Sequence, residues 1–386
     1  MKKHFTYVDA VNQVYLPEHQ FNGVYRSETG AVPFKVTKRR LHGGVQDGID
    51  VVEIDSGRFV FTVALTRGMN VLCARCDDLE LKWDSPVGGP VHPKFVPLFA
   101  PNGCGWLEGF SEWIARCGLE SNGAPEFNSS GVVYPLHGRI ANLPARKAEL
   151  TVDEESGVIE LSGDVREVSV FGHNFLLHVK YSIEIGSTKL RVEDSITNLS
   201  SMDDEFELLY HINTGNPLVG AGSRALVPFK TMCPRDANAV SELPEWDRFV
   251  DPVSGRPETC YFFDLATDSD GKTKTALFNR DETRGVALSF NKSDFPYFIL
   301  WKTQRPNEDI YVSGMEPAVN FPNTRSFEKR NGRVVAIQAK ETRVFSFELE
   351  ALVGADATQR CAHEIAALQK NVVPEIQPSP NSEWCE

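Results

Sequence analysis

The chain has 386 residues, of which 41% are hydrophobic and 24% are charged, so it carries far more apolar material than a disordered chain. Its formal net charge of −13 argues against nucleic acid or an anionic membrane surface as the main partner. The N-terminal segment lacks the apolar run of a signal peptide, and no stretch approaches the roughly twenty apolar residues of a membrane span. These features predict a globular, cytoplasmic protein.

The eight cysteines are scattered and predict free thiols, because a chain of this length does not need a disulfide framework. Cys73 and Cys76 form one CxxC pair, but no second pair stands at zinc-site spacing. The cysteines therefore predict no metal site.

Alternating apolar residues dominate the chain and predict antiparallel strands. A hairpin fits residues 148–163, where AELTV and VIELS flank the turn DEESG. A second hairpin begins with LLHVKYSIEIG at 176–186 and resumes after Gly186. Further strands are expected at 51–55, 58–65, 205–213, 285–291, 296–302, 309–316 and 343–352.

Two segments have helical spacing. In GWLEGFSEWIARC, at 105–117, the apolar residues recur every three or four positions, and Gly118 is a candidate C-cap. The second helix is expected over 356–370, with Asp356 or Thr358 as its N-cap.

The many strands and few helices predict an all-β fold, one large antiparallel β-sandwich with one or two short rim helices. No repeat or linker divides the chain, so residues 1–386 are expected to form a single domain. Its core would span about 40–352, followed by a helix and tail at 356–386. Uncovered sheet edges often pair, so a homodimer is compatible with this fold.

The string LHG occurs twice, in RLHGG at 40–44 and in PLHGR at 135–139. His42 is followed by a turn at 46–48. His137 lies in a turn-like segment close to Arg139, and loops carry functional sites more often than strands do. Both histidines are candidates on this evidence.

A third histidine stands near the end of a predicted strand, in EFELLYHINTGNP at 205–217. Tyr210 and Ile212 belong to the apolar face, so His211 and Asn213 share the opposite face. The segment fits a binding site and a half-exposed strand histidine equally well.

One carboxylate stands out, in EDIYVSGMEPAVNFPNTR at 308–325. Glu316 shares the face of Val312 and Gly314, where a carboxylate is unusual without partners. Pro317 is expected to force the chain out of the ladder. Imidazole titrates near neutrality, and burial can raise a glutamate toward it, so two histidines and Glu316 suit general acid–base catalysis.

The segments YPLHGRIANLPA, LLYHINTGNPL and IYVSGMEPAVNFP, in that order, resemble the aldose 1-epimerase (galactose mutarotase-like) superfamily. They are most similar to its epimerase-like branch of unknown function, as are DGIDVVEIDSG, LTRGMNVL and ARCGLESNGAP. The resemblance covers roughly residues 40–350. It implies a large twisted antiparallel sandwich and an isomerase that acts on a small-molecule carbohydrate without a cofactor or a metal.

In the mechanism that the resemblance implies, the sugar ring opens and recloses with C1 inverted. His211 would give a proton to the ring oxygen, and Glu316 would take the proton of the anomeric hydroxyl. His137 would orient the substrate. His137 is preferred to His42 because the histidine string of this superfamily follows the early strands, whereas His42 precedes them.

The resemblance also implies further substrate-binding residues. Arg116 or Arg67 would replace an arginine that simple mutarotases carry before the first histidine, and Asp309 would replace their sugar-binding aspartate. Trp106 is expected to stack on a sugar face or, as its spacing favours, to pack in the core. The complete expected substrate-binding set is His137, Arg139, Asn213, Arg116, Asn122, Arg67, Asp309 and Trp106.

Three alternatives stay open. The first is a carbohydrate-binding protein without turnover. The second is a metal-dependent sugar isomerase with a shell of His92, His137, His211 and Glu316. The third is a phosphorylated substrate, bound by Arg139, Arg146 or Arg224.

Overall fold

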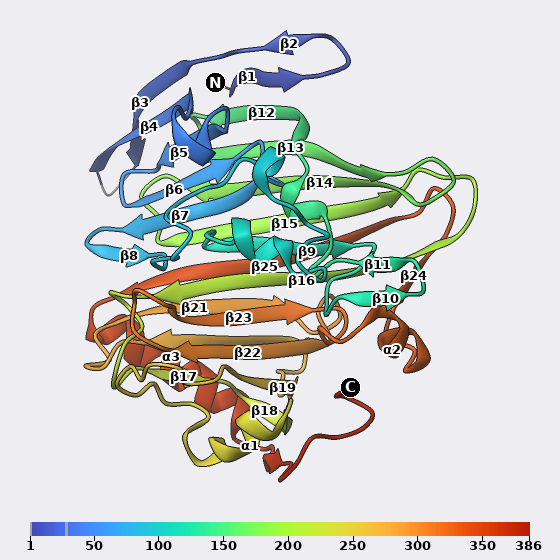
Figure 1. Ribbon diagram of the computed structural model, residues 1–386. Helices are drawn as coiled ribbons and strands as arrows, with labels where there is room; N and C mark the ends of the chain where they lie inside the picture. Colours follow the sequence, from blue (N-terminus) through green and yellow to red (C-terminus); the bar gives the residue numbers. More distant parts are fainter. Residues whose placement is uncertain (1, 28–29) are drawn as a thin grey trace.

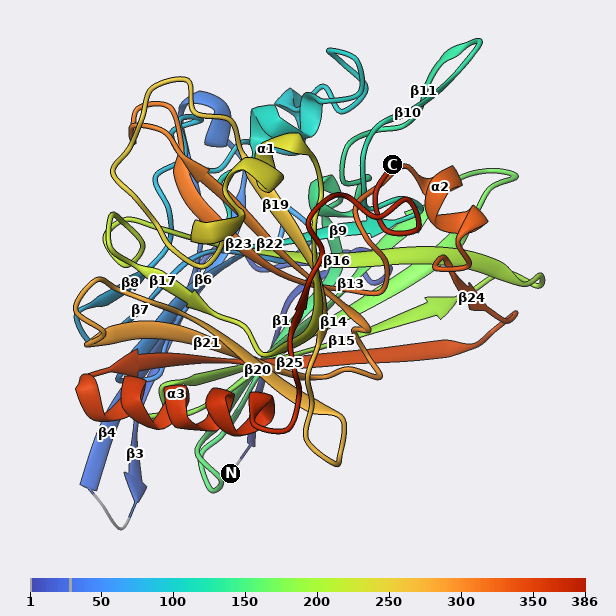
Figure 2. The same ribbon diagram turned by 90° about the horizontal axis from the view of Figure 1, so that it is seen from below.

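The computed structural model describes residues 2–27 and 30–386 and places most of them in two packed sheets (Figures 1 and 2). In the described chain the smaller sheet has ten strands, in the order β17 (Arg224–Leu226), β20 (Lys272–Phe278), β21 (Arg284–Asn291), β25 (Thr342–Val353), β15 (Lys189–Asn198), β14 (Asn174–Glu184), β13 (Val158–Val168), β12 (Ala145–Asp153), β1 (Lys2–Asp9) and β2 (Val14–Tyr15).

The larger sheet runs in the order β26 (Glu375–Ile376), β18 (Phe229–Pro234), β19 (Thr259–Leu265), β22 (Tyr297–Gln304), β23 (Tyr311–Ala318), β16 (Asp204–Gly215), β9 (Ile114–Leu119), β7 (Asn70–Cys76), β6 (Phe59–Ala64), β5 (Asp50–Asp55), β4 (Gly30–Arg40) and β3 (His19–Ser27). Strand β24 (Val335–Ile337) joins β16, and β8 (Leu79–Leu81) joins β7. The strands β10 (Glu126–Asn128) and β11 (Gly131–Tyr134) form a separate hairpin. Strands β18 and β26 pair in parallel, and the other neighbours pair antiparallel.

Short helices lie around the sheets: α1 (Ala237–Ser241), α2 (Arg325–Arg330) and α3 (Ala355–Gln369), with 3₁₀ turns η1 (Gly44–Gln46), η2 (Pro93–Phe95), η3 (Gly105–Gly109), η4 (Ile140–Asn142) and η5 (Leu243–Glu245). Helix α3 contacts β20, β21 and β25 and lies across the smaller sheet (Figure 2). The predicted β-sandwich is confirmed. Among the described residues, no helix combines the length and the apolar character that a membrane crossing requires.

The core between the sheets follows from the alternation in the sequence. Along β14 every second residue, from Phe175 to Ile183, is buried in a cluster that draws on both sheets. Strand β14 pairs with β15, and β12 pairs with β13, as the two hairpin predictions require.

The middle of the larger sheet, along β9, β16 and β23, is buried on both faces, whereas burial alternates along β13 and β14 of the smaller sheet. The covered outer face of the larger sheet can therefore hold a site. On β16, Leu208, Tyr210 and Ile212 enter the core between the sheets. Leu209 points the other way, into a second apolar cluster where loops cover the outer face of the sheet. His211 shares the face of Leu209, because side chains alternate along a strand.

The helix predicted over 105–117 is wrong. The segment forms the short 3₁₀ turn η3 and then strand β9, which pairs with β16. A Cβ atom at Gly105 would lie 1.9 Å from the carbonyl oxygen of Pro97. The backbone here is packed too closely against its neighbour to leave room for the side chains of a regular helix. The free energy gained when this segment pairs within the sheet outweighs the helix preference that the spacing of its apolar residues indicated.

Two smaller expectations also need correction. Helix α3 begins at Ala355, after Gly354, and no side chain caps it, so neither Asp356 nor Thr358 is the N-cap. Strand β23 continues through Pro317, which stands opposite Phe298 of β22, and ends at Ala318.

Candidate active site

A cavity of about 240 Å³ opens on the outer face of the larger sheet, under the loops that cover it. This volume lies just below the usual range of pockets for drug-sized ligands, so it suits a small molecule. Its walls come from β16, β19, β22 and β23 and from the turn η3. The lining residues are Trp106, Leu107, Phe110, Ala124, Leu136, His137, His211, Arg235, Glu258, Cys260, Trp301, Glu316 and Pro322.

His211 and Glu316 are cross-strand neighbours at this cavity. The pairs Ile212–Met315 and Leu209–Ala318 of β16 and β23 fix a register in which His211 stands opposite Glu316. The His211 Nε2 and Glu316 Oε1 atoms lie 3.1 Å apart, and both side chains are almost fully buried.

Gly314 leaves the space that this pair needs. A Cβ atom at Gly314 would lie 2.4 Å from Glu316 Oε1 and 3.0 Å from His211 Cε1. Gly314 is two residues from Glu316 on β23 and stands opposite Asn213 on β16. A residue without a side chain is therefore required beside the pair.

Asn213 fixes the tautomer of His211. The Asn213 Nδ2 group donates to the carbonyl oxygens of Glu112 and His211, both at 3.0 Å, so its Oδ1 atom is the acceptor toward His211. His211 Nδ1 lies 2.5 Å from that oxygen and must donate. In the neutral ring, Nε2 then carries the lone pair and faces Glu316.

His137 is held in the same tautomer by backbone. Its Nδ1 atom lies 2.8 Å from the carbonyl oxygen of Asn122 and donates to it, which leaves Nε2 as an acceptor. The residue has a left-handed conformation, with φ of 56°, and its N–H donates to the carbonyl of Gly123. The rings of His137 and His211 are 5.5 Å apart and nearly perpendicular.

Burial controls the charge of these three groups. It lowers the pKa of His137 to about 4 and that of His211 to about 3, and it raises the pKa of Glu316 well above its ordinary value. Near neutral pH both imidazoles are therefore neutral, and burial favours the protonated form of Glu316. His211 Nε2 and Glu316 Oε1, 3.1 Å apart, are close enough for a proton to pass between the two side chains.

A second polar group lies on the wall formed by β18, β19 and β22. The Arg235 Nη2 atom donates to Glu258 Oε1 at 2.7 Å, and the Trp301 indole donates to Glu258 Oε2 at 2.8 Å. Burial opposes ionisation of Glu258, but Arg235 and Trp301 outweigh it and lower the pKa. The sequence reading missed Arg235 and Glu258, because both lie just outside strands and carry no pattern.

Aromatic rings complete the cavity. Trp106 lies 4.6 Å from the His137 ring, and Phe110 and Trp301 lie 5.0 and 5.2 Å from the His211 ring. Trp106 thus packs in the outer cluster and also lines the cavity, so both expectations for it describe part of its position. Such rings offer flat apolar faces to the C–H groups of a ligand.

Asn122 and Asn213 act on the site through the histidines and do not line the cavity. The Asn122 carbonyl holds His137, and its side chain bonds Asn320 at 2.8 Å. Asn213 holds His211. Both side chains are fully buried, and their direct contact with a substrate stays a prediction.

The two arginines expected to bind substrate are buried elsewhere. Arg116 points into the core between the sheets, where it pairs with Asp194 at 2.5 Å and donates to the Tyr181 hydroxyl at 2.8 Å. Arg67 pairs with Glu112 and donates to the carbonyl of Gly109, under the loops that cover the site. Neither side chain lines the cavity.

Arg139 and Asp309 also lie outside the cavity lining. Arg139 precedes η4, and Asp309 is exposed in the turn before β23. The structure therefore gives no support to their assignment to substrate binding.

The remaining histidine candidates are also separate from the site. His42 is 77% exposed and lies 3.7 Å from Asp47, in keeping with the choice of His137. His92 caps η2 and accepts a hydrogen bond from the backbone of Lys94. The proposed metal shell of His92, His137, His211 and Glu316 does not assemble, because His92 does not line the cavity.

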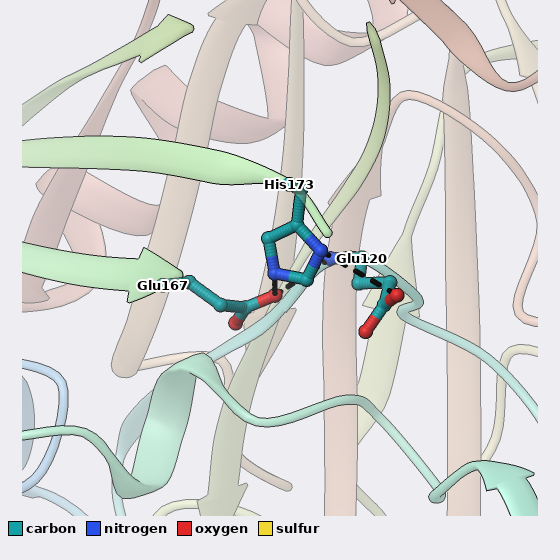
Figure 3. Close-up of side chains that lie close together, drawn as sticks. All are labelled: Glu120, Glu167 and His173. Atoms are coloured by element: carbon teal, nitrogen blue, oxygen red, sulfur yellow. Dashed lines mark hydrogen bonds and ion pairs between the residues drawn. The ribbon is translucent and has the colours of Figure 1, made fainter. Parts of the chain in front are cut away.

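A polar cluster supports the segment that holds His137. The His173 ring lies between the carboxylates of Glu120 and Glu167, with Nδ1 and Nε2 at 3.4 and 3.2 Å from them (Figure 3). These three residues are close enough to be considered as metal ligands. Each ring nitrogen faces a different carboxylate, which is the arrangement of a protonated imidazole that donates to both.

The cluster is tied to the backbone that follows β9. Glu167 accepts hydrogen bonds from the N–H groups of Leu119 and Glu120, two residues before Asn122. Burial acts to lower the pKa of His173, but the two carboxylates outweigh it and raise the pKa to about 9. The charged cluster therefore fixes the chain from which Asn122 reaches His137.

The fold is that of the aldose 1-epimerase and galactose mutarotase-like proteins. The structure of a candidate aldose 1-epimerase from Klebsiella pneumoniae subsp. pneumoniae matches with a TM-score of 0.93 and 26% identity, over 98% of this chain and 99% of that chain. The chain belongs to the family described as a domain of unknown function, DUF4432, whose model matches residues 46–351. The resemblance predicted from the sequence is thus confirmed.

More distant structures share the fold alone. A galactose mutarotase related enzyme from Lactobacillus acidophilus matches with a TM-score of 0.53 and 12% identity, over 79% of this chain and 98% of that chain. A galactose mutarotase-like protein from Clostridium acetobutylicum matches with a TM-score of 0.51 and 14% identity, over 82% and 98%. No curated protein matches the chain.

Proposed function

We propose that this protein is a cofactor-independent isomerase that opens and recloses the ring of a small, uncharged sugar. The observation that carries the proposal is the buried His211–Glu316 pair, whose Nε2 and Oε1 atoms lie 3.1 Å apart at a cavity of small-molecule size. A protein that only binds sugar needs hydrogen bonds and stacking. It has no need of two titrating groups held 3.1 Å apart.

The proposed step moves two protons and leaves the pair neutral. Substrate hydroxyls that donate to Glu316 lower its pKa and favour transfer of its proton to His211. His211 then protonates the ring oxygen while Glu316 takes the proton of the anomeric hydroxyl, and the bond between the anomeric carbon and the ring oxygen breaks. The free aldehyde or ketone rotates and recloses by the reverse step on its other face.

The other cavity residues fit binding roles in this reaction. His137 is neutral and presents Nε2 as an acceptor for a sugar hydroxyl. The rings of Trp106, Phe110 and Trp301 give apolar faces for the C–H side of the sugar. Glu258 offers carboxylate oxygens that can accept further hydroxyl hydrogen bonds.

The charges of the cavity favour an uncharged substrate over a sugar phosphate. Arg235 is the cation that lines it in the described chain, and its Nε and Nη2 atoms donate to Asp236 and Glu258. Two carboxylates thus accompany one guanidinium. The arginines considered for phosphate lie elsewhere: Arg139 and Arg146 are outside the lining, and Arg224 pairs with Glu282.

Exchange NMR on a panel of aldoses and ketoses tests the proposal, with hexose phosphates and hexuronates as the anionic arm. We expect anomer interconversion faster than the spontaneous rate for at least one uncharged sugar. Acceleration only of anionic sugars would refute the substrate class. Sugar binding without acceleration would instead favour a carbohydrate-binding protein.

A further inference from the structure

Two cysteines far apart in sequence meet beside the cavity wall. The Cys233 and Cys385 sulfur atoms lie 3.6 Å apart, although 152 positions separate the residues. Both are buried, and both are free thiols in this structure. Cys233 lies near the end of β18, and Cys385 lies in the segment after β26.

The segment after α3 is held along the edge of the larger sheet. Strand β26 pairs with β18, and the N–H of Gln377 donates to the carbonyl of Met232 at 2.9 Å. Further on, the N–H of Asn381 donates to the Cys233 sulfur at 3.2 Å. The two thiols therefore face each other where this tail, residues 371–386, crosses β18.

The same tail contacts the loop that follows β23. Asn323 Nδ2 donates to the carbonyl of Trp384 at 2.8 Å, and the Trp384 ring lies 5.0 Å from that of Phe321. The neighbouring residue Pro322 lines the cavity, and Arg235, two residues after Cys233, lines it as well. The tail thus supports two cavity walls at once.

We propose that Cys233 and Cys385 are a redox modification site at which a low-molecular-weight disulfide of the glutathione type joins the tail covalently to β18. The thiolate of one of the two cysteines, exposed when the tail lifts, attacks a sulfur of the oxidant and releases one small thiol. The other cysteine then loses its proton and attacks the mixed disulfide, which releases the second small thiol. The protein loses two protons and two electrons, and the oxidant is reduced to two thiols.

Little movement is needed to close the bond. A disulfide has sulfur atoms about 2 Å apart, so the two side chains must rotate toward each other by the remaining distance. The bond would close a loop of about 150 residues, and long loops are where a cross-link restricts the unfolded chain most. It would also prevent the tail from leaving Pro322 and β18.

The proposal is tested on the full chain with oxidised glutathione, independently of any sugar. We expect the denatured protein to lose two of its eight thiols and peptide mapping to find a Cys233–Cys385 link. Protease cleavage within residues 371–386 should slow at least about tenfold and recover after reduction. Cys385→Ser and Cys233→Ser should abolish the link and the slower cleavage, and substitution of Cys361, a buried cysteine of α3, by serine should keep them.

If a variant fails to fold, the thiol count, the peptide map and the protease cleavage of the wild-type protein still test the proposal. A link between other cysteines would overturn the proposal. So would retention of all eight thiols under conditions in which protease still cleaves the tail, because the tail then opens without the bond forming.

Discussion

His211 of β16 and Glu316 of β23 stand opposite each other, with Nε2 and Oε1 3.1 Å apart and both side chains buried. This cross-strand relationship gives Glu316 a polar neighbour on a face of β23 that otherwise carries Val312, Gly314 and Ala318. Burial disfavours the charged form of both groups, so the pair is stable as a neutral acid beside a neutral imidazole. A bound sugar that stabilises the Glu316 carboxylate can favour transfer of the carboxyl proton to His211.

Replacement of Asn213 by aspartate tests what sets the tautomer of His211. A carboxylate that accepts from Nδ1 stabilises the imidazolium, so we expect the pKa of His211 to rise from its value of about 3. NMR titration of labelled histidine measures this change. The same substitution at Asn216, which bonds Asn307 in a turn, should leave His211 unchanged. An unaltered His211 pKa in Asn213→Asp would contradict the role given to Asn213.

Gly314→Ala should displace the Glu316 carboxyl group. The new Cβ atom would lie 2.4 Å from Oε1, so either the carboxyl or the strand must move. We expect a loss of about 1–3 kcal/mol of unfolding free energy and a fall in turnover of about 100-fold. Chemical denaturation and exchange NMR measure the two effects.

Gly220→Ala is a suitable control, because its Cβ atom would meet only Asn216 Oδ1, at 3.1 Å. If the Gly314→Ala variant had the same turnover as wild type, the position of the Glu316 carboxyl group would not matter for the reaction.

The sequence predicted much of this site because alternation fixes which residues share a face. Gly314 and Glu316 were expected on one face of their strand, and His211 was expected to face away from Tyr210. Both expectations agree with the structure. Alternation says nothing about which strands become neighbours. The resemblance, rather than the pattern, suggested that β16 and β23 would bring the two residues together.

Arg116 shows where the pattern gives no information. Every residue of β9 is buried, since the middle of the larger sheet is covered on both faces, so burial does not reveal which face Arg116 takes. Its partner Asp194 lies on β15 of the opposite sheet. A pairing between sheets depends on how they pack, and the local sequence carries no sign of it.

His173→Gln tests the charged cluster that supports the segment before His137. The folded pKa of about 9 lies above the ordinary value of 6.5, so the protonated ring stabilises the fold. This contribution is complete below pH 6.5 and is lost as the pH rises through 9. Because solvent screens part of this interaction, we expect the free energy of unfolding of wild type to exceed that of the variant by on the order of 1–2 kcal/mol at pH 6.

Urea denaturation at pH 6, 8 and 9.5 measures this difference. The stability advantage of wild type should shrink across that range. A difference between the two proteins that stays constant with pH would show that His173 is not charged in the folded state.

Glu316→Gln tests the central claim most directly. The glutamine amide can still donate a hydrogen bond to His211 Nε2, so the fold should be retained, but it cannot accept the proton of the anomeric hydroxyl. Exchange NMR on a sugar that the wild type interconverts should show a rate at least about 100-fold lower, while His42→Asn, at an exposed histidine, should match wild type. A folded Glu316→Gln protein that interconverts anomers as fast as wild type would contradict the account.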